Sequence, residues 1–94
     1  MQTNKKAVEA LKEMLLDSIG DSREEAVKEL ARYKKHFACI LDYNIYAYGN
    51  ILPYYSQIRE FFEKQGVEYP SNTEKLDRMF KVYVREAVDS ILTK

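Results

Sequence analysis

Hydrophobic residues recur at intervals of three and four along most of the chain, which is the spacing of helices that bury one face. The beginning of the chain shows this spacing in six apolar residues: Ala7, Val8, Leu11, Met14, Leu15 and Ile19. They predict a helix over 4–19, and Gly20 supplies the left-handed position that commonly ends a helix. Ser22 and Glu25 have the spacing of a capping box, which predicts that a second helix begins near residue 23.

The second stretch keeps the helical spacing for longer than the first. Its inward positions step by three and four through seven residues: Ala26, Leu30, Tyr33, Phe37, Leu41, Asn44 and Tyr48. This spacing predicts one long helix over 23–48, ended by Gly49. An alternative breaks the helix near 42–44, because the alternation from Tyr43 to Tyr46 also suits a strand. We favour the helix, since nothing else in the sequence offers that strand a partner.

A third helix is expected over 52–65. Asn50 can cap it, Pro53 fits its first turn, and Gly66 ends it. Four residues form the inward stripe of this helix: Leu52, Tyr55, Ile58 and Phe62. Tyr54 and Phe61 lie next to the stripe and widen it.

A fourth helix is expected over 72–92, beginning at a capping box of Ser71 and Glu74. Its inward residues follow the same spacing: Leu76, Met79, Phe80, Tyr83, Ala87 and Ile91. Four helices with short connections predict an all-α fold, a compact four-helix bundle that forms a single domain over 1–94.

Composition narrows the class of protein. The 15 basic and 15 acidic residues cancel, which argues against a generally basic nucleic-acid-binding protein. Apolar residues make up 46% of the chain, too many for a disordered protein, and they are too interrupted for a membrane span. One cysteine excludes an internal disulfide, and the polar beginning of the chain does not resemble a signal peptide. We therefore expect a cytoplasmic protein that makes no membrane contact.

Residues that could carry catalysis are few. The three glycines stand alone, so they form no phosphate-binding loop, and we expect no cofactor. His36 and Cys39 lie three residues apart on one helical face, but nothing in the sequence completes a metal site around them. We expect no enzyme; if there were a catalytic pocket, His36 would be its first candidate for acid–base chemistry.

The fourth expected helix carries four basic residues at spacings of three and four: Lys75, Arg78, Lys81 and Arg85. They share about a third of the helix circumference and could face phosphates, so nucleic-acid binding is the alternative function. Glu74 and Asp89 flank them at positions suited to ion pairs with Arg78 and Arg85, which favours an ordinary charged surface.

Tyrosine is the residue that departs most from a typical composition. The chain has eight, and five fall between residues 43 and 55. Tyrosine combines a large apolar ring with a hydroxyl, which suits protein interfaces. Both faces of a central helix can also be buried, so core packing stays open for these rings. The candidate partner-binding residues are Tyr43, Tyr46, Tyr54 and His36, and the same region could support a homodimer.

The segment from Asp42-Tyr43-Asn44 through Tyr48-Gly49-Asn50-Ile51-Leu52 to Ile58-Arg59-Glu60-Phe61 and Gly66 resembles short helical proteins encoded on bacterial phages and conjugative elements. The size and helical pattern are also similar to bacteriocin-immunity bundles. Neither resemblance implies an activity or a catalytic residue. Both imply only a small accessory protein that binds something larger. The tyrosine excess and the missing catalytic motifs favour a non-enzymatic protein that acts by protein–protein association, and we expect a regulator or inhibitor of the anti-defence or immunity type.

Overall fold

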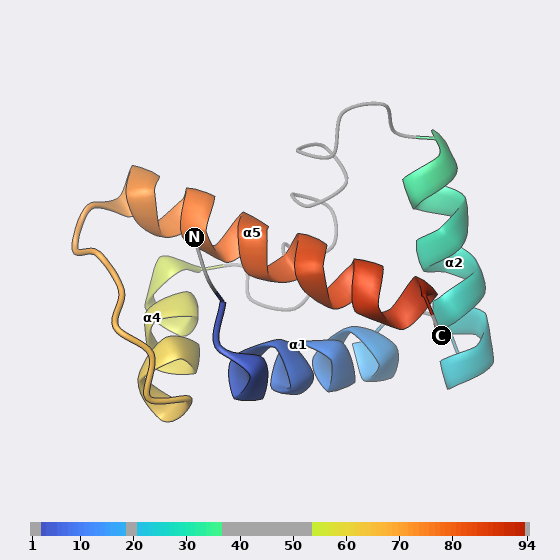
Figure 1. Cartoon of the computed structure of the whole chain (residues 1–94), viewed down its shortest axis with the longest axis horizontal. Helices are drawn as coiled ribbons and strands as arrows, with labels where there is room; N and C mark the ends of the chain where they lie inside the picture. Colours follow the sequence, from blue (N-terminus) through green and yellow to red (C-terminus); the bar gives the residue numbers. More distant parts are fainter. Residues whose placement is uncertain (1–2, 19–20, 37–53, 94) are drawn as a thin grey trace.

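The computed structural model describes residues 3–18, 21–36 and 54–93, with the side chains of Ser18 and of 33–36 left out. Within this part of the chain there are four helices and no strand: α1 (Lys5–Ser18), α2 (Arg23–His36), α4 (Tyr55–Lys64) and α5 (Thr73–Leu92) (Figure 1). The structure confirms the expected all-α four-helix bundle. Residues 37–48 of the expected long helix, and with them the choice between helix and strand, lie outside the described residues.

The longest helix, α5, runs the length of the molecule, and α1 lies along it in the same direction (Figure 1). Their interface is the most extensive between any two described helices. The other two helices pack near the two ends of this pair. α4 contacts α5 at its N-terminal end, whereas α2 contacts both α1 and α5 near their C-terminal ends (Figure 1).

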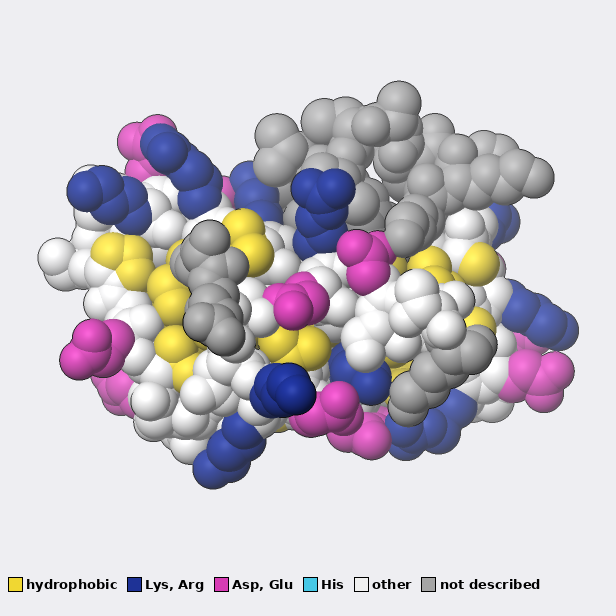
Figure 2. Space-filling view, viewed as in Figure 1, with side chains coloured by type: hydrophobic (Ala, Val, Ile, Leu, Met, Phe, Trp, Pro, Cys, Tyr) yellow, Lys and Arg dark blue, Asp and Glu magenta, His cyan; other side chains and the backbone are white. Residues whose placement is uncertain are grey.

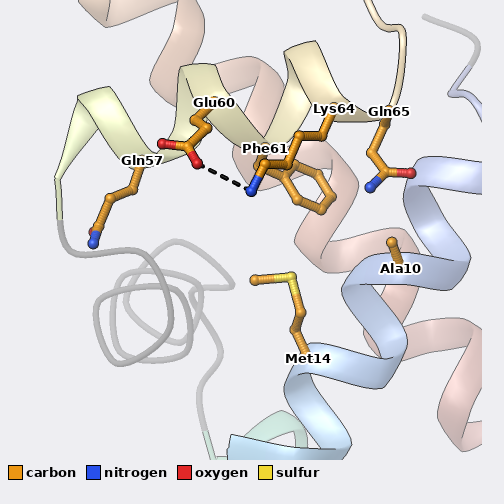
Figure 3. Close-up of a pocket in the computed structure, with 7 residues that line it drawn as sticks. All are labelled: Ala10, Met14, Gln57, Glu60, Phe61, Lys64 and Gln65. Carbon is orange, nitrogen blue, oxygen red and sulfur yellow. Dashed lines mark ion pairs between the residues drawn. The ribbon is translucent and has the colours of Figure 1, made fainter.

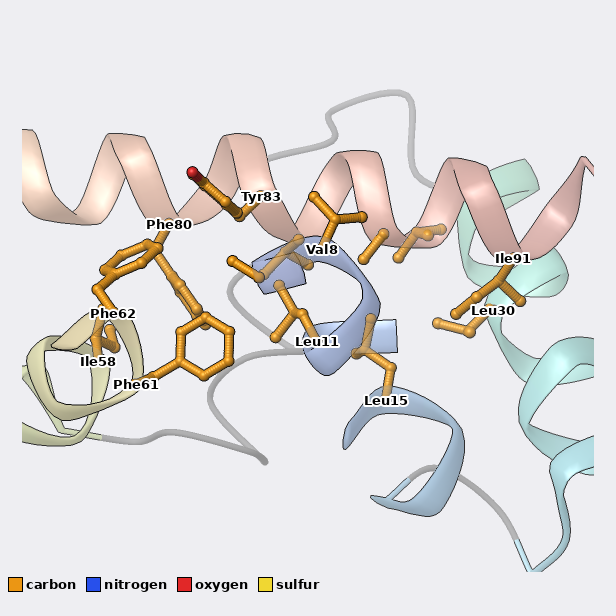
Figure 4. Packing of buried hydrophobic residues seen from close by; sticks show 14 of the residues in the cluster. Val8, Leu11, Leu15, Leu30, Ile58, Phe61, Phe62, Phe80, Tyr83 and Ile91 are labelled. Atoms are coloured by element: carbon orange, nitrogen blue, oxygen red, sulfur yellow. The ribbon is translucent and has the colours of Figure 1, made fainter. Parts of the chain in front are cut away.

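The hydrophobic core follows the line between α1 and α5 (Figure 4). Leu11 and Leu15 of α1 are fully buried, as is Leu30 of α2. Burial of each such side chain contributes about 1.5–3 kcal/mol to folding. The full set of buried apolar residues is Ala7, Val8, Leu11, Leu15, Ala26, Leu30, Ile58, Phe61, Phe62, Leu76, Phe80, Tyr83, Val84, Ala87, Val88 and Ile91.

Aromatic rings fill the end of the core where α4 meets α5. Phe62 is fully buried, and its ring meets Phe80 edge-on at 6.0 Å and Tyr83 edge-on at 5.1 Å between centroids. Tyr69 stacks on Phe62 at 6.4 Å. Edge-on and offset contacts are the favourable geometries for aromatic pairs, so this cluster fixes α4 against α5 (Figure 4).

Two of the expected helix ends are confirmed. The Ser22 hydroxyl accepts a hydrogen bond from the backbone N–H of Glu25 at 3.1 Å, as expected for the start of α2. At the end of α4, Gly66 has a φ of 70°. The N–H groups of Gly66 and Val67 donate to the carbonyls of Glu63 and Phe62, which is a Schellman motif.

Two expectations about helix starts are wrong. Asn72, and not Ser71, caps α5: its side chain accepts from the backbone N–H of Lys75 at 3.0 Å, and the helix begins at Thr73. The helix expected from residue 52 begins at Tyr55, with Tyr54 as its N-cap, so Pro53 is not in its first turn.

Also wrong are the expected inward positions of Tyr54, which is 67% exposed, and of Tyr55. The side chain of Tyr55 is 45% exposed, because α4 begins at this residue and only the following turns pack on α5. Those turns bury Ile58, Phe61 and Phe62. No helix among the described residues is both long enough and apolar enough to cross a bilayer.

Candidate protein-binding site

A groove of about 470 Å³ opens between α1 and α4 (Figure 3). Its apolar lining comes from both helices: Ala10 and Met14 lie on α1, and the ring of Phe61 extends from α4. Phe61 also belongs to the core and is 7% exposed, so the apolar wall of the groove is anchored in the packed interior. Its polar lining comes from the end and outer face of α4: Gln57, Glu60, Lys64 and Gln65. We call these seven residues the α1–α4 groove.

The charges along the groove cancel. Glu60 Oε1 and Lys64 Nζ are 3.0 Å apart, one helical turn from each other, and both side chains are exposed (Figure 3). A pair of this kind contributes about 0.3–0.5 kcal/mol to helix stability. Because the other five lining residues are uncharged, the groove presents an apolar surface without a net field. This suits an uncharged, apolar ligand segment better than an ion.

The most exposed aromatic residue of the described chain, Tyr54, precedes the groove residue Gln57 by three positions, at the start of α4. Tyr54 is 67% exposed. Its backbone N–H donates to Oε1 of Gln57, a groove residue, at 3.2 Å. This hydrogen bond satisfies one of the otherwise unpaired polar groups at the start of α4. It also fixes the backbone of Tyr54 against the first turn of α4, where Gln57 lines the groove.

Of the four expected partner-binding residues, the structure describes the side chain of Tyr54 alone. Tyr43 and Tyr46 lie outside the described residues, and His36 ends α2 without a described side chain. Sequence analysis missed Met14 and Phe61 as candidate contacts because it assigned both to the core. The signal that separates Met14 from Leu11 and Leu15 is its position at the flank of the apolar stripe, where it is half-buried.

The four basic residues expected to form a ridge on α5 do not share one environment. Lys81 Nζ lies 2.7 Å from Asp77 Oδ2, and the two side chains are 16% and 17% exposed. Arg78 is exposed and pairs with Glu74 at 2.7 Å, as expected from their spacing. Lys75 and Arg85 are exposed. Because Lys81 is half-buried and paired with Asp77, the basic surface that phosphate binding would use is interrupted at this position.

A second hollow, of about 410 Å³, lies where the start of the chain meets α5 and the α4–α5 connection. The backbone N–H of Asn4 donates to the hydroxyl of Tyr83 here at 3.0 Å, and the hydroxyl of Thr3 donates to Glu86. These bonds hold the beginning of the chain on α5. The lining contains one carboxylate, that of Glu68, so the hollow offers little chemistry.

No protein-family model, curated protein or solved structure matches the chain. In ranges 3–18, 21–36 and 54–93, no three His, Cys, Asp or Glu residues converge on a position that could hold a metal ion.

Proposed function

We propose that this protein acts by binding another protein, without catalysing a reaction, and that the α1–α4 groove together with Tyr54 is the contact surface. The observation that supports this most is the hydrogen bond between Tyr54 and Gln57. It links the backbone of an exposed tyrosine to a residue that lines an apolar groove. Binding hot spots commonly combine a tyrosine with a pocket that an apolar side chain fills.

The chemistry of the groove favours a peptide segment of the partner with one apolar anchor. Met14 and Phe61 offer the anchor an apolar wall, and the flexible thioether of Met14 adapts to side chains of different shape. The amides of Gln57 and Gln65 can both donate and accept hydrogen bonds, as the backbone of such a segment requires. A role as a regulator or inhibitor from a phage or mobile element rests on the sequence resemblance.

Affinity capture from extracts of the native host tests this proposal when groove variants are compared with a matched control. Ala10→Arg fills the groove from α1, and Tyr54→Ala removes the exposed ring. Lys28→Ala changes an exposed residue of α2 that lies outside the groove. We expect the wild type and the Lys28 variant to retain the same protein, identified by mass spectrometry, and both groove variants to lose it.

The captured protein is then purified and its affinity measured by calorimetry for each variant. Thermal unfolding shows whether Ala10→Arg and Tyr54→Ala keep the fold. If folded groove variants bind the same proteins as the wild type with unchanged affinity, the groove is not the contact surface.

A further inference from the structure

The outer face of α5 carries five residues in one straight stripe, of which four are exposed and Asp89 is half-buried. They are separated by three, four, four and three residues, and they occupy about 80° of the helix circumference. We call this set the α5 stripe: Lys75, Arg78, Val82, Glu86 and Asp89. Lys81 falls outside it, beside its partner Asp77.

The centre of the α5 stripe is apolar. Val82 is 41% exposed, and it is the single large hydrophobic side chain of α5 that is this exposed. Val82 does not belong to the buried core cluster or to the residues packed against it. An apolar centre within a charged border is the layout of a helix–helix contact.

The charges of the stripe are sorted along the helix. Lys75 and Arg78 precede Val82, whereas Glu86 and Asp89 follow it. Figure 2 shows basic side chains along the upper edge of this face over α5, with acidic side chains beside them at the N-terminal end and near the middle. This order is opposite to the one that the helix dipole favours, because the N-terminus of a helix prefers acidic residues and the C-terminus prefers basic ones. The charges of the stripe are therefore not stabilised by the dipole of α5.

The order is instead complementary to an antiparallel copy of itself. Arg78 and Glu86 are each four residues from Val82, and Lys75 and Asp89 are each seven residues from it. When a second α5 lies antiparallel across a two-fold axis at Val82, Arg78 faces Glu86 of the second copy. Lys75 then faces Asp89 of the second copy, and the two valines meet at the axis. Each off-axis contact occurs twice and the valine contact once, as two-fold symmetry requires.

We propose that this protein forms a homodimer through the α5 stripe, with the two α5 helices antiparallel and Val82 on the two-fold axis. The existing ion pair of Arg78 with Glu74 does not oppose this arrangement: both side chains are more than 70% exposed, and such pairs exchange at little cost. Glu86 accepts from Thr3 through one carboxylate oxygen, Oε2, and keeps the other for Arg78 of the second copy. The chain has no net charge, so two copies do not repel each other.

The dimer is independent of the α1–α4 groove. The groove is built from α1 and α4, whereas the stripe lies on α5, so a dimer presents two grooves to other proteins. Only one helix from each copy forms the contact, which places it among small interfaces that associate weakly and reversibly. Because the two Arg78–Glu86 pairs join exposed side chains on either side of the valines, the association is expected to weaken as salt is raised.

Sedimentation equilibrium of the full chain over a concentration series tests the proposal by charge reversal. Arg78→Glu places like charges opposite each other twice, and so does Glu86→Arg. We expect each single variant to raise the dimer dissociation constant about tenfold or more, which corresponds to about 1.4 kcal/mol. The double variant exchanges the charges and should return to within about threefold of the wild type.

A matched control reverses an ion pair on another helix. Lys28→Glu and Glu24→Lys change the same charges at an exposed pair of α2, and they should leave the dissociation constant unchanged. Circular dichroism confirms that each variant is folded. A wild type that stays monomeric at millimolar concentration overturns the proposal, and so does a double variant that fails to recover dimerisation.

Titration with duplex DNA separates the dimer from a phosphate-binding surface. A phosphate-binding surface loses affinity with Arg78→Glu and gains affinity with Glu86→Arg, because only the second variant adds positive charge. In the dimer, both variants weaken the association of the two copies. Opposite effects of the two variants on DNA binding, together with a monomeric wild type, would replace the dimer by the nucleic-acid alternative.

Discussion

The side chain of Gln57 accepts a hydrogen bond from the backbone N–H of Tyr54 at 3.2 Å, across the first turn of α4. The side chain of Tyr54 is not one of the usual N-cap side chains, such as serine or asparagine. The bond to Gln57, the third residue of α4, satisfies one polar backbone group at the start of the helix. We predict that Gln57→Ala lowers the free energy of unfolding by about 0.5 kcal/mol. Urea denaturation measures it, and Gln65→Ala at the other end of α4 controls for the loss of an amide.

The cap of α5 distinguishes two neighbouring polar residues. Asn72 Oδ1 accepts from the N–H of Lys75, whereas no described hydrogen bond involves the side chain of Ser71. Asn72→Ala should therefore lower the free energy of unfolding by about 1 kcal/mol. Ser71→Ala should change it by less than about 0.5 kcal/mol. Equal losses in the two variants, measured by urea denaturation, would show that the start of α5 is wrongly placed.

Lys12 is a charged residue in a buried position. Its side chain is 7% exposed, and among the described residues its ammonium has one partner, Glu9 Oε1, at 3.2 Å. Glu9 is itself 67% exposed, so the pair repays little of the cost of removing the ammonium from water. We predict that Lys12→Met raises the free energy of unfolding by about 1 kcal/mol.

The exposed Lys28 provides the control for this prediction. Lys28→Met removes a charge of the same kind from a side chain that is 67% exposed, and it should change stability by less than about 0.5 kcal/mol. Thermal and urea unfolding of the two variants measure the difference. A loss of stability in Lys12→Met would mean that the ammonium of Lys12 is better solvated or paired than its contacts indicate.

Tyr69 gives the protein a defined response to alkaline pH. Its hydroxyl donates a hydrogen bond to Glu63, which raises the pKa of Tyr69 above its ordinary value of 10.0. The protonated phenol is thus favoured by folding, and its contribution is complete below the pKa of the unfolded chain. That contribution is lost as the pH rises through the higher pKa of the folded protein.

The prediction is tested by comparing the wild type with Tyr69→Phe across pH. The difference in their free energy of unfolding should stay constant through the neutral range and shrink as the pH rises above about 10. Glu63→Gln should lower the pKa of Tyr69 toward its ordinary value, measured from the difference in phenolate absorbance between this variant and its Tyr69→Phe derivative. Glu60→Gln removes a nearby carboxylate that does not touch Tyr69. An unchanged pKa in Glu63→Gln would contradict the hydrogen bond.

The helices were largely predictable because their apolar spacing is regular. The buried residues of α5, from Leu76 to Ile91, are the expected ones except Met79, which is half-buried, and Val84 and Val88 are added to the same face. The cap was harder to predict: Ser71 and Asn72 are both suitable, and only the backbone geometry at Asn72 decides between them. The burial of Lys12 was also not predictable, because a charged residue is normally assigned to the surface. Its position falls on the buried stripe of α1, between Val8 and Leu15.

The candidate sites were less predictable because they depend on how helices meet. Spacing placed Met14 on the inner face of α1, but the α1–α4 groove exists because Met14 lies at the flank that faces α4. The basic residues of α5 were found by spacing alone. What separates Lys81 from Arg78 is the packing around α5, which leaves Arg78 exposed and encloses Lys81 with Asp77.

Site-specific photo-crosslinking in the native host tests most directly whether the groove and Tyr54 bind another protein. A benzophenone amino acid at position 54 keeps an aromatic ring there and extends it with a photoreactive group, and the same group at position 28 on α2 is the control. We predict one discrete crosslinked protein from position 54 that is absent from position 28 and lost when Ala10→Arg fills the groove. Identical crosslinks from both positions, or none from position 54, would contradict the proposed function.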